Sequence, residues 1–241
     1  MRKHKSMFML FSRSSVYPVL GLLSLMCVVQ VGLFCLAMNS GEYSTLEMII
    51  EESNIHLACY VAFWILFGMM TGYAGSVSGG MEYTLNRLRI SRWGIVGWSS
   101  LCNTLWFLAF WMVEALLVLA LSSYYLDVQE VESGQALFLA CYRSEFLHSL
   151  VPLREWSRWG RNLALIVGFG VTTGCCVGKI RRGGILVAVV GAAVGASFFP
   201  EAPCSGGGDA LLIVCALGTA LVSLILVQEG KEETEDEETT V

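Results

Sequence analysis

Long apolar runs separated by short polar loops are the main feature of this chain. A membrane-spanning helix needs about 20 mostly apolar residues, and three runs meet that length easily, at 16–38, 56–78 and 96–121. Three shorter runs follow at 162–178, 184–199 and 209–227. The pattern predicts an all-α, polytopic membrane helix bundle with about six transmembrane helices.

The fourth and fifth runs are near the lower length limit for a span. The turn between them, KIRRGG, carries three cations and two glycines, which argues against one continuous helix. Small residues recur every four positions on both runs and would let two helix backbones approach closely. A tightly packed hairpin is therefore expected. If it dips into the bilayer and returns, the crossings fall to four and both chain ends stay on one side.

Lysine and arginine in short loops predict the orientation, because cytoplasmic loops are enriched in both. Basic groups precede the first run, follow the second and separate the fourth from the fifth, whereas the loops after the first and fifth runs are acidic. This alternation predicts a multi-pass cell-membrane protein with both termini in the cytoplasm. We expect one transmembrane domain, 1–228, and an acidic, disordered cytoplasmic tail, 229–241.

The start MRKHK, followed by an apolar run, raises the alternative of a cleaved secretory signal. The run is longer than a signal peptide needs, and no convincing small-residue cleavage site follows it. A retained first helix is expected instead.

The composition agrees with a lipid environment: 55% of the residues are hydrophobic and 15% are charged, against about 25% charged in soluble domains. The net charge of −5 comes from the acidic tail. No basic face suggests nucleic acid, and no His or Cys spacing suggests a metal or cofactor. Most cysteines lie in apolar runs, although a disulfide between Cys141 and Cys204 on the outer side is an open alternative.

Motifs for intramembrane or ATP-dependent catalysis are missing from the sequence. There is no H-E-x-x-H pair and no G-x-x-x-x-G-K-[ST] phosphate loop, so the chain lacks a common zinc site and a common ATPase site. The run GSVSGG at 75–80 lacks the spacing of a rhomboid-like serine protease. We expect a protein that is not an enzyme.

Three polar residues inside the spans are candidates for lining a transport pathway. Glu114 lies midway along the third run, where a charge costs about 2.5–3.5 kcal/mol or more on insertion scales. Asn103 lies eleven residues earlier on the same helical side, and Gln30 lies in the first run. The competing interpretation is structural: a satisfied buried carboxyl for Glu114 and polar contacts between helices for Gln30.

The loop MEYTLNRLRISRWG, 81–94, is predicted to form a short amphipathic helix along the cytoplasmic surface. Two interpretations are open: a positive-inside anchor with Trp93 at the interface, or a docking helix for a cytoplasmic partner. Two stretches of the sequence are similar to small permease-like proteins of Gram-positive bacteria. The first overlaps this loop and reads YTLNRLRISRWGIVGWSSLCNTLWFLAFWMVEALLVLAL, and the second reads FLHSLVPLREWSRWGRNLAL. With its short basic N-terminal stretch, six predicted spans and basic helical loop between the second and third, the chain also resembles type-2 ATP-binding-cassette transporter permeases.

The resemblance implies a function and a partner surface. A permease of this class moves its substrate with energy from separate ATPase subunits and pairs with a second permease as a homo- or heterodimer. Its loop after the second span packs against the ATPase, so the implied docking residues here are Tyr83, Leu85, Arg87, Leu88, Arg89 and Arg92. The chain departs from the family in one respect, because its long outer segment follows the third span and not the fifth.

That amphipathic outer segment, 122–161, separates the third and fourth runs. Residues 135–150 are predicted to form a helix that ends before Pro152, since proline lacks a donor and clashes with the preceding turn. Residues 153–160 would begin a second short helix with Trp156 and Trp159 at headgroup depth. The alternative function is a non-transporting immunity, sensor or scaffold protein that binds a partner through this segment.

Overall fold

The described part of the chain is entirely helical. The structure is a computed structural model, and it describes residues 2–40, 45–76, 91–129, 133–153, 155–176 and 206–239. No strand occurs within these ranges. The described helices are α1 (Arg2–Ser40), α2 (Leu46–Glu52), α3 (Ile55–Ser76), α5 (Arg92–Val128), α6 (Ser133–Arg143), α7 (Glu145–Leu150), α8 (Trp156–Cys175) and α10 (Gly206–Thr239).

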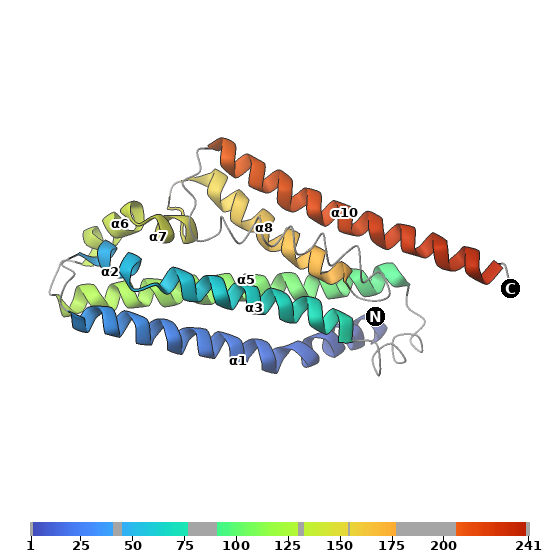
Figure 1. Cartoon of the computed structure of the whole chain (residues 1–241), viewed down its shortest axis with the longest axis horizontal. Coiled ribbons are helices and arrows are strands. Elements are labelled where there is room, and N and C mark those ends of the chain that lie inside the picture. Colours follow the sequence, from blue (N-terminus) through green and yellow to red (C-terminus); the bar gives the residue numbers. More distant parts are fainter. Residues whose placement is uncertain are drawn as a thin grey trace.

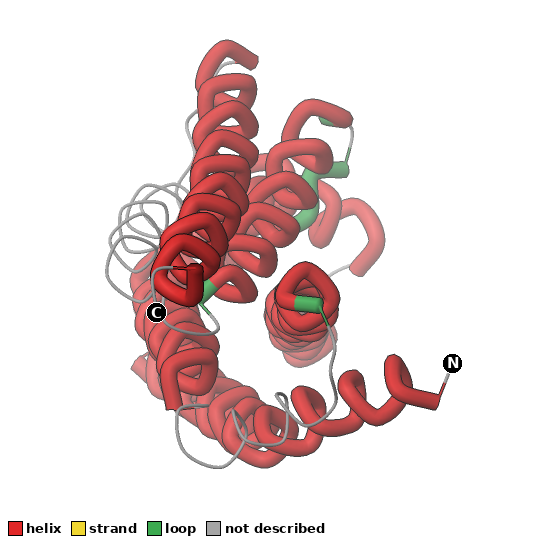
Figure 2. The backbone as a smooth tube through the Cα atoms, turned by 90° about the vertical axis from the view of Figure 1, so that its right-hand side faces the viewer, coloured by secondary structure: helices red, strands yellow, loops and turns green. Residues whose placement is uncertain are grey.

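Contacts between the long helices fix their relative directions (Figure 1). Phe8 contacts Trp98 and Gln30 bonds Glu114, so α1 and α5 run in parallel. Helix α3 returns in the opposite direction and packs mainly beside α1. Helices α6 and α7 lie with α2 at the end where α5 finishes. The start of α1 and the end of α10 both lie at the opposite end of the bundle, and Figure 2 views the helices from that end.

Three described helices are long and apolar enough to cross a membrane: Phe11–Asn39, Trp93–Val128 and Gly208–Gln228. A fourth candidate is the pair Leu46–Glu52 and Ile55–Thr71, which is bent by 45°. The structure therefore gives the helices of a membrane-embedded protein with three candidate spans, or four with the bent pair. Six spans are not shown: α8 is not among the candidates, and the predicted run 184–199 lies outside the described residues.

The bend between α2 and α3 has a local cause. Asn54 lies between the two helices with a φ of 57°, the left-handed region. Asparagine tolerates that region better than other non-glycine residues because its short side chain can hydrogen-bond locally. Its Nδ2 donates to the Glu52 carbonyl at 3.1 Å, so the break is built into the sequence at this position.

Helix boundaries differ from the sequence prediction in the outer segment. The predicted helix 135–150 is two helices, α6 and α7, divided at Ser144, whose backbone is extended. Of the predicted second short helix, 153–160, residues 156–160 form the first part of α8, which continues without interruption to Cys175. Pro152 lies in the connection between α7 and α8, as its missing N–H predicts.

The last described helix includes the acidic residues near the end of the chain. Helix α10 continues to Thr239 and includes residues 229–238, and the disordered tail expected at 229–241 stays a prediction. Glutamate and lysine have good helix propensity, and extending an existing helix avoids the cost of nucleation. These two effects account for the helical extension.

Aromatic side chains form the centre of the bundle. Phe63 of α3 contacts Phe107 and Phe110 of α5, and it also contacts Phe169 of α8 at a centroid distance of 5.2 Å. Phe67 adds a further edge-on contact with Phe169. Such pairs contribute about 0.5–1.5 kcal/mol each beyond area burial, so they tie α3, α5 and α8 together.

Glycines allow α8 to approach both of its neighbours closely. A Cβ on Gly170 would lie 2.0 Å from Thr104 Oγ1, and one on Gly174 would lie 2.5 Å from Ser100 Cα, both on α5. On the other side, a Cβ on Gly168 would lie 2.8 Å from the Ala216 carbonyl of α10. The small residues of this run thus serve contacts with α5 and α10. Its predicted hairpin partner lies outside the described residues.

Candidate functional site

Glu114 is the centre of the first candidate site. It lies on α5 and is fully buried. The amide nitrogen of Gln30, on α1, donates to both carboxylate oxygens at 2.9 Å each. The thiol of Cys59, on α3, is a further hydrogen-bond partner of the same carboxyl. Three helices therefore meet at one carboxyl group.

The partners of Glu114 do not balance its charge. None of the ion pairs among the described residues includes Glu114. An ionised carboxylate in a low-dielectric interior is costly unless a counter-charge is present. Gln30 is fully buried as well, and its Oε1 atom accepts no hydrogen bond from the described part of the chain.

The structure brings together two of the three predicted pathway residues. Glu114 and Gln30 are in direct contact, but Asn103 contacts a different helix. The Asn103 amide nitrogen donates to Thr173 Oγ1 of α8 at 3.0 Å, and both residues are buried. Eleven residues of helix correspond to about 16 Å along the axis. Asn103 therefore forms a separate polar contact between α5 and α8, and its role in a pathway stays a prediction.

Of the six implied ATPase-docking residues, the structure describes only Arg92. Tyr83, Leu85, Arg87, Leu88 and Arg89 lie outside the described residues. Arg92 is the first residue of α5, directly after the N-cap residue Ser91, whose hydroxyl accepts from the Gly94 amide at 3.3 Å. The docking surface stays a prediction.

A second buried polar cluster was not predicted from the sequence. Arg161, near the start of α8, is fully buried and pairs through Nη1 with Asp209 Oδ1 of α10 at 3.2 Å. Its Nη2 donates to Ser149 Oγ of α7 at 3.1 Å and to Asn162 Oδ1 at 3.1 Å. Asn162 in turn donates to the Ser149 carbonyl at 2.9 Å. The cluster joins three helices at the end of the bundle opposite the termini.

One sequence signal points to this cluster. Arg161 and Asp209 have opposite charges, and each lies at the start of an apolar run on the predicted outer side. Arg161 directly precedes the run 162–178 and Asp209 is the first residue of the run 209–227, so the hydropathy pattern treats both as residues at the boundary of a span. Hydropathy alone does not show that the two runs are neighbours.

Helices α6 and α7 and the start of α8 make ionic and aromatic contacts. Arg143 of α6 pairs with Glu47 of α2 at 3.5 Å, and His148 of α7 lies 3.7 Å from Glu155. The Trp159 ring packs edge-on against Trp111 of α5 at 5.5 Å. The segment 122–161 is thus anchored to the bundle end.

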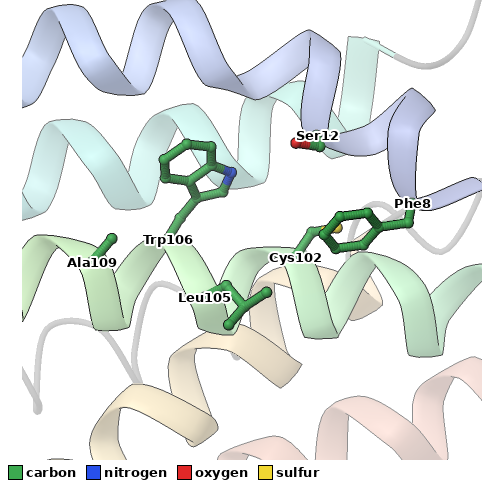
Figure 3. A pocket seen from close by; sticks show the side chains of 6 residues that line it. All are labelled: Phe8, Ser12, Cys102, Leu105, Trp106 and Ala109. Atoms are coloured by element: carbon green, nitrogen blue, oxygen red, sulfur yellow. The ribbon is translucent and has the colours of Figure 1, made fainter.

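A shallow pocket of about 210 Å³ lies between α1 and α5 (Figure 3). None of the predicted site residues lines it. The lining is mostly apolar and consists of Phe8, Ser12, Cys102, Leu105, Trp106 and Ala109. Among the described residues, no group of three or more His, Cys, Asp or Glu side chains could hold a metal ion.

Comparison of the chain with protein-family models, with curated proteins and with solved structures found no match. The resemblance to transporter permeases therefore rests on features of the sequence alone: the basic N-terminal stretch, the predicted spans, the basic loop and the runs 83–121 and 146–165.

Proposed function

We propose that this chain is the membrane-spanning permease subunit of an ATP-binding-cassette transporter and moves its substrate with energy from separate ATPase subunits. The observation that carries the proposal is the buried Glu114, held by Gln30 of α1 and Cys59 of α3 within a candidate span. Ionisable residues inside membrane spans are rare and mark substrate or ion pathways. Movement of these three helices relative to one another would change the hydrogen bonds that the Glu114 carboxyl accepts from Gln30 and Cys59.

The sequence supports ATP hydrolysis by a separate subunit. The chain has no phosphate-binding loop of the G-x-x-x-x-G-K-[ST] type, so by that route ATP would be hydrolysed by another polypeptide. In the proposed complex the segment 83–92 receives the ATPase motion. Two permease chains, identical or similar, form the pathway, and each crosses the cell membrane six times.

The proposed orientation places both termini in the cytoplasm. The positive-inside pattern of the loops supports it. The start of α1 and the end of α10 lie at the same end of the bundle (Figure 1), which is the arrangement that two cytoplasmic termini require. In this orientation α6 and α7 lie on the outer side.

A second candidate function is a non-transporting membrane protein that binds a partner through 122–161. The exposed aromatic side chains of this segment favour it: Tyr142 is 66% exposed and Trp156 is 88% exposed. Large exposed apolar groups that cluster on a surface mark interaction sites or membrane contacts. In this alternative Glu114 has a structural role.

Co-purification tests the transport proposal. The proposal predicts that an adjacent gene encodes an ATPase of the ATP-binding-cassette type. The full chain is expressed with that ATPase and purified through a tag on the permease. We expect the ATPase to co-purify, and we expect Arg87→Glu with Arg89→Glu to abolish the complex. Arg143→Glu is the matched control, since Arg143 lies on α6 at the opposite end of the bundle. Absence of any ATPase from the wild-type preparation would overturn the proposal.

Glu114 is tested by Glu114→Gln in a transport assay. We expect loss of transport with normal expression, because glutamine keeps the size of the side chain and removes its charge. Glu52→Gln, at an exposed position on α2, is the control and should leave transport unchanged. Transport at the wild-type rate by Glu114→Gln would contradict the pathway role.

A further inference from the structure

In the contact between Glu114 and Gln30, one polar atom of the Gln30 amide has no hydrogen-bond partner among the described residues. A single amide nitrogen, Gln30 Nε2, lies 2.9 Å from both carboxylate oxygens. The other end of the amide, Oε1, is buried and accepts nothing from the described residues. A buried acceptor without a donor costs free energy, so a lasting contact of this form calls for an explanation.

The two ends of a glutamine amide exchange places when the amide turns by 180°. After this turn Oε1 lies where Nε2 lies now, about 2.9 Å from the carboxylate oxygens. That distance falls within the range for an O–H···O hydrogen bond. A neutral Glu114 would donate its O–H to Oε1 there, so the acceptor would gain its donor, while Nε2 would move to the position that Oε1 occupies now.

Charge balance also favours a proton on Glu114. The titratable groups that face the carboxyl are the thiols of Cys27 on α1 and Cys59 on α3. No lysine, arginine or histidine of the described residues pairs with Glu114. Among the described residues, no group of three or more His, Cys, Asp or Glu side chains could hold a metal ion. A proton is the cation that fits.

We infer that Glu114 and Gln30 form a proton-binding site in the middle of the helix bundle, in which the Gln30 amide serves both states of the acid. In the loaded state the carboxylic O–H donates to Gln30 Oε1. When the proton leaves to water, the amide turns and its N–H group donates to both oxygens, which is the arrangement in the structure. The site does not depend on an ATPase, so it goes beyond the proposed function.

Infrared spectroscopy of the full chain in lipid nanodiscs tests this inference. Spectra are recorded over a series of pH values from acidic to alkaline, in H₂O and in D₂O. We expect a carbonyl band of a protonated carboxylic acid that Glu114→Gln removes and Glu114→Asp moves. Wild-type and Glu114→Gln spectra without such a difference at any pH would overturn the site. No ATPase is present, so this result and that of the co-purification are independent.

The part played by Gln30 is tested by Gln30→Met, which keeps a similar volume and removes the amide. The acid loses its acceptor, so its carbonyl band should move to higher wavenumber. Gln129→Met, at an exposed residue after α5, is the control and should leave the band in place. Circular dichroism establishes that each variant is folded. A band that Gln30→Met leaves unmoved would overturn the role of Gln30.

Discussion

Arg161 and Asp209 are 48 residues apart in the sequence, yet Arg161 Nη1 lies 3.2 Å from Asp209 Oδ1 with both side chains buried. The pair joins the start of α8 to the start of α10. These two helices run in the same direction, as the close approach of Gly168 to Ala216 further along also shows. The ion pair therefore sets the register of two parallel neighbours.

Arg161→Leu is expected to destabilise the folded bundle by about 3–5 kcal/mol, because it leaves the Asp209 carboxylate buried without its partner. The double variant Arg161→Leu with Asp209→Leu should recover part of this loss, since no charge is then buried. Unfolding in mixed micelles, followed by circular dichroism, measures the difference. Arg143→Leu is the control and should cost less than about 1 kcal/mol, because the Arg143–Glu47 pair is exposed. Equal stabilities for the single and double variants would contradict the role of the pair.

Gly174→Ala is expected to destabilise the α5–α8 contact by about 1–3 kcal/mol, because inserting a methyl group into a packed contact displaces its neighbours. The added Cβ would lie 2.3 Å from Ser100 Oγ and 2.5 Å from Ser100 Cα. Gly160→Ala, on the same helix, meets nothing within 4 Å. It should leave stability unchanged or raise it by up to about 1 kcal/mol through helix propensity. Thermal unfolding in detergent compares the two, and equal midpoints would show that α8 does not pack this closely.

Asn103 and Thr173 should be energetically coupled, because the amide of one donates to the hydroxyl of the other at 3.0 Å. Hydrogen bonds between membrane helices contribute about 0.6 kcal/mol on average and up to about 1.7 kcal/mol. A double-mutant cycle with Asn103→Leu and Thr173→Val measures the coupling. The pair Asn103→Leu and Thr219→Val is the control and should be additive, since Thr219 Oγ1 donates to its own helix at Ala216.

Cys141 on α6 should react slowly with iodoacetamide. Its side chain is buried, and burial raises the pKa of the Cys141 thiol above its ordinary value of 9.0. The reactive thiolate is thus a smaller fraction at pH 8 than in a free cysteine. For the same reason this thiol contributes stability below about pH 9 that is lost as the pH rises further. Peptide mass spectrometry follows the labelling.

The control for Cys141 is the variant Cys141→Ala with Tyr142→Cys, because Tyr142 is largely exposed. A cysteine there should be alkylated at least about ten times faster. Similar rates would show that α6 does not bury this position. Cys141 forms no disulfide with another cysteine of the described residues. A mass corresponding to a Cys141–Cys204 disulfide would show the alternative pairing, whose second member lies outside the described residues.

Some elements of the fold follow directly from residue patterns. The runs 16–38, 56–78 and 96–121 lie within α1, α3 and α5, except for the last two residues of the second. Glu114 and Gln30 were singled out because polar residues are rare in such runs. Boundaries in 122–161 were less predictable: the break at Ser144 has no proline or glycine, and α8 begins six residues before its apolar run.

The sequence by itself determined that the chain is helical and that several of its helices match the thickness of a bilayer, because hydropathy and length depend only on the residues in each run. The tertiary structure alone decided which helices are neighbours. Lipid is as apolar as a packed helix face, so hydropathy cannot distinguish the two environments. The contacts Gln30–Glu114, Asn103–Thr173 and Arg161–Asp209 join residues far apart in the chain, and only the packing of the helices brings them within hydrogen-bonding distance.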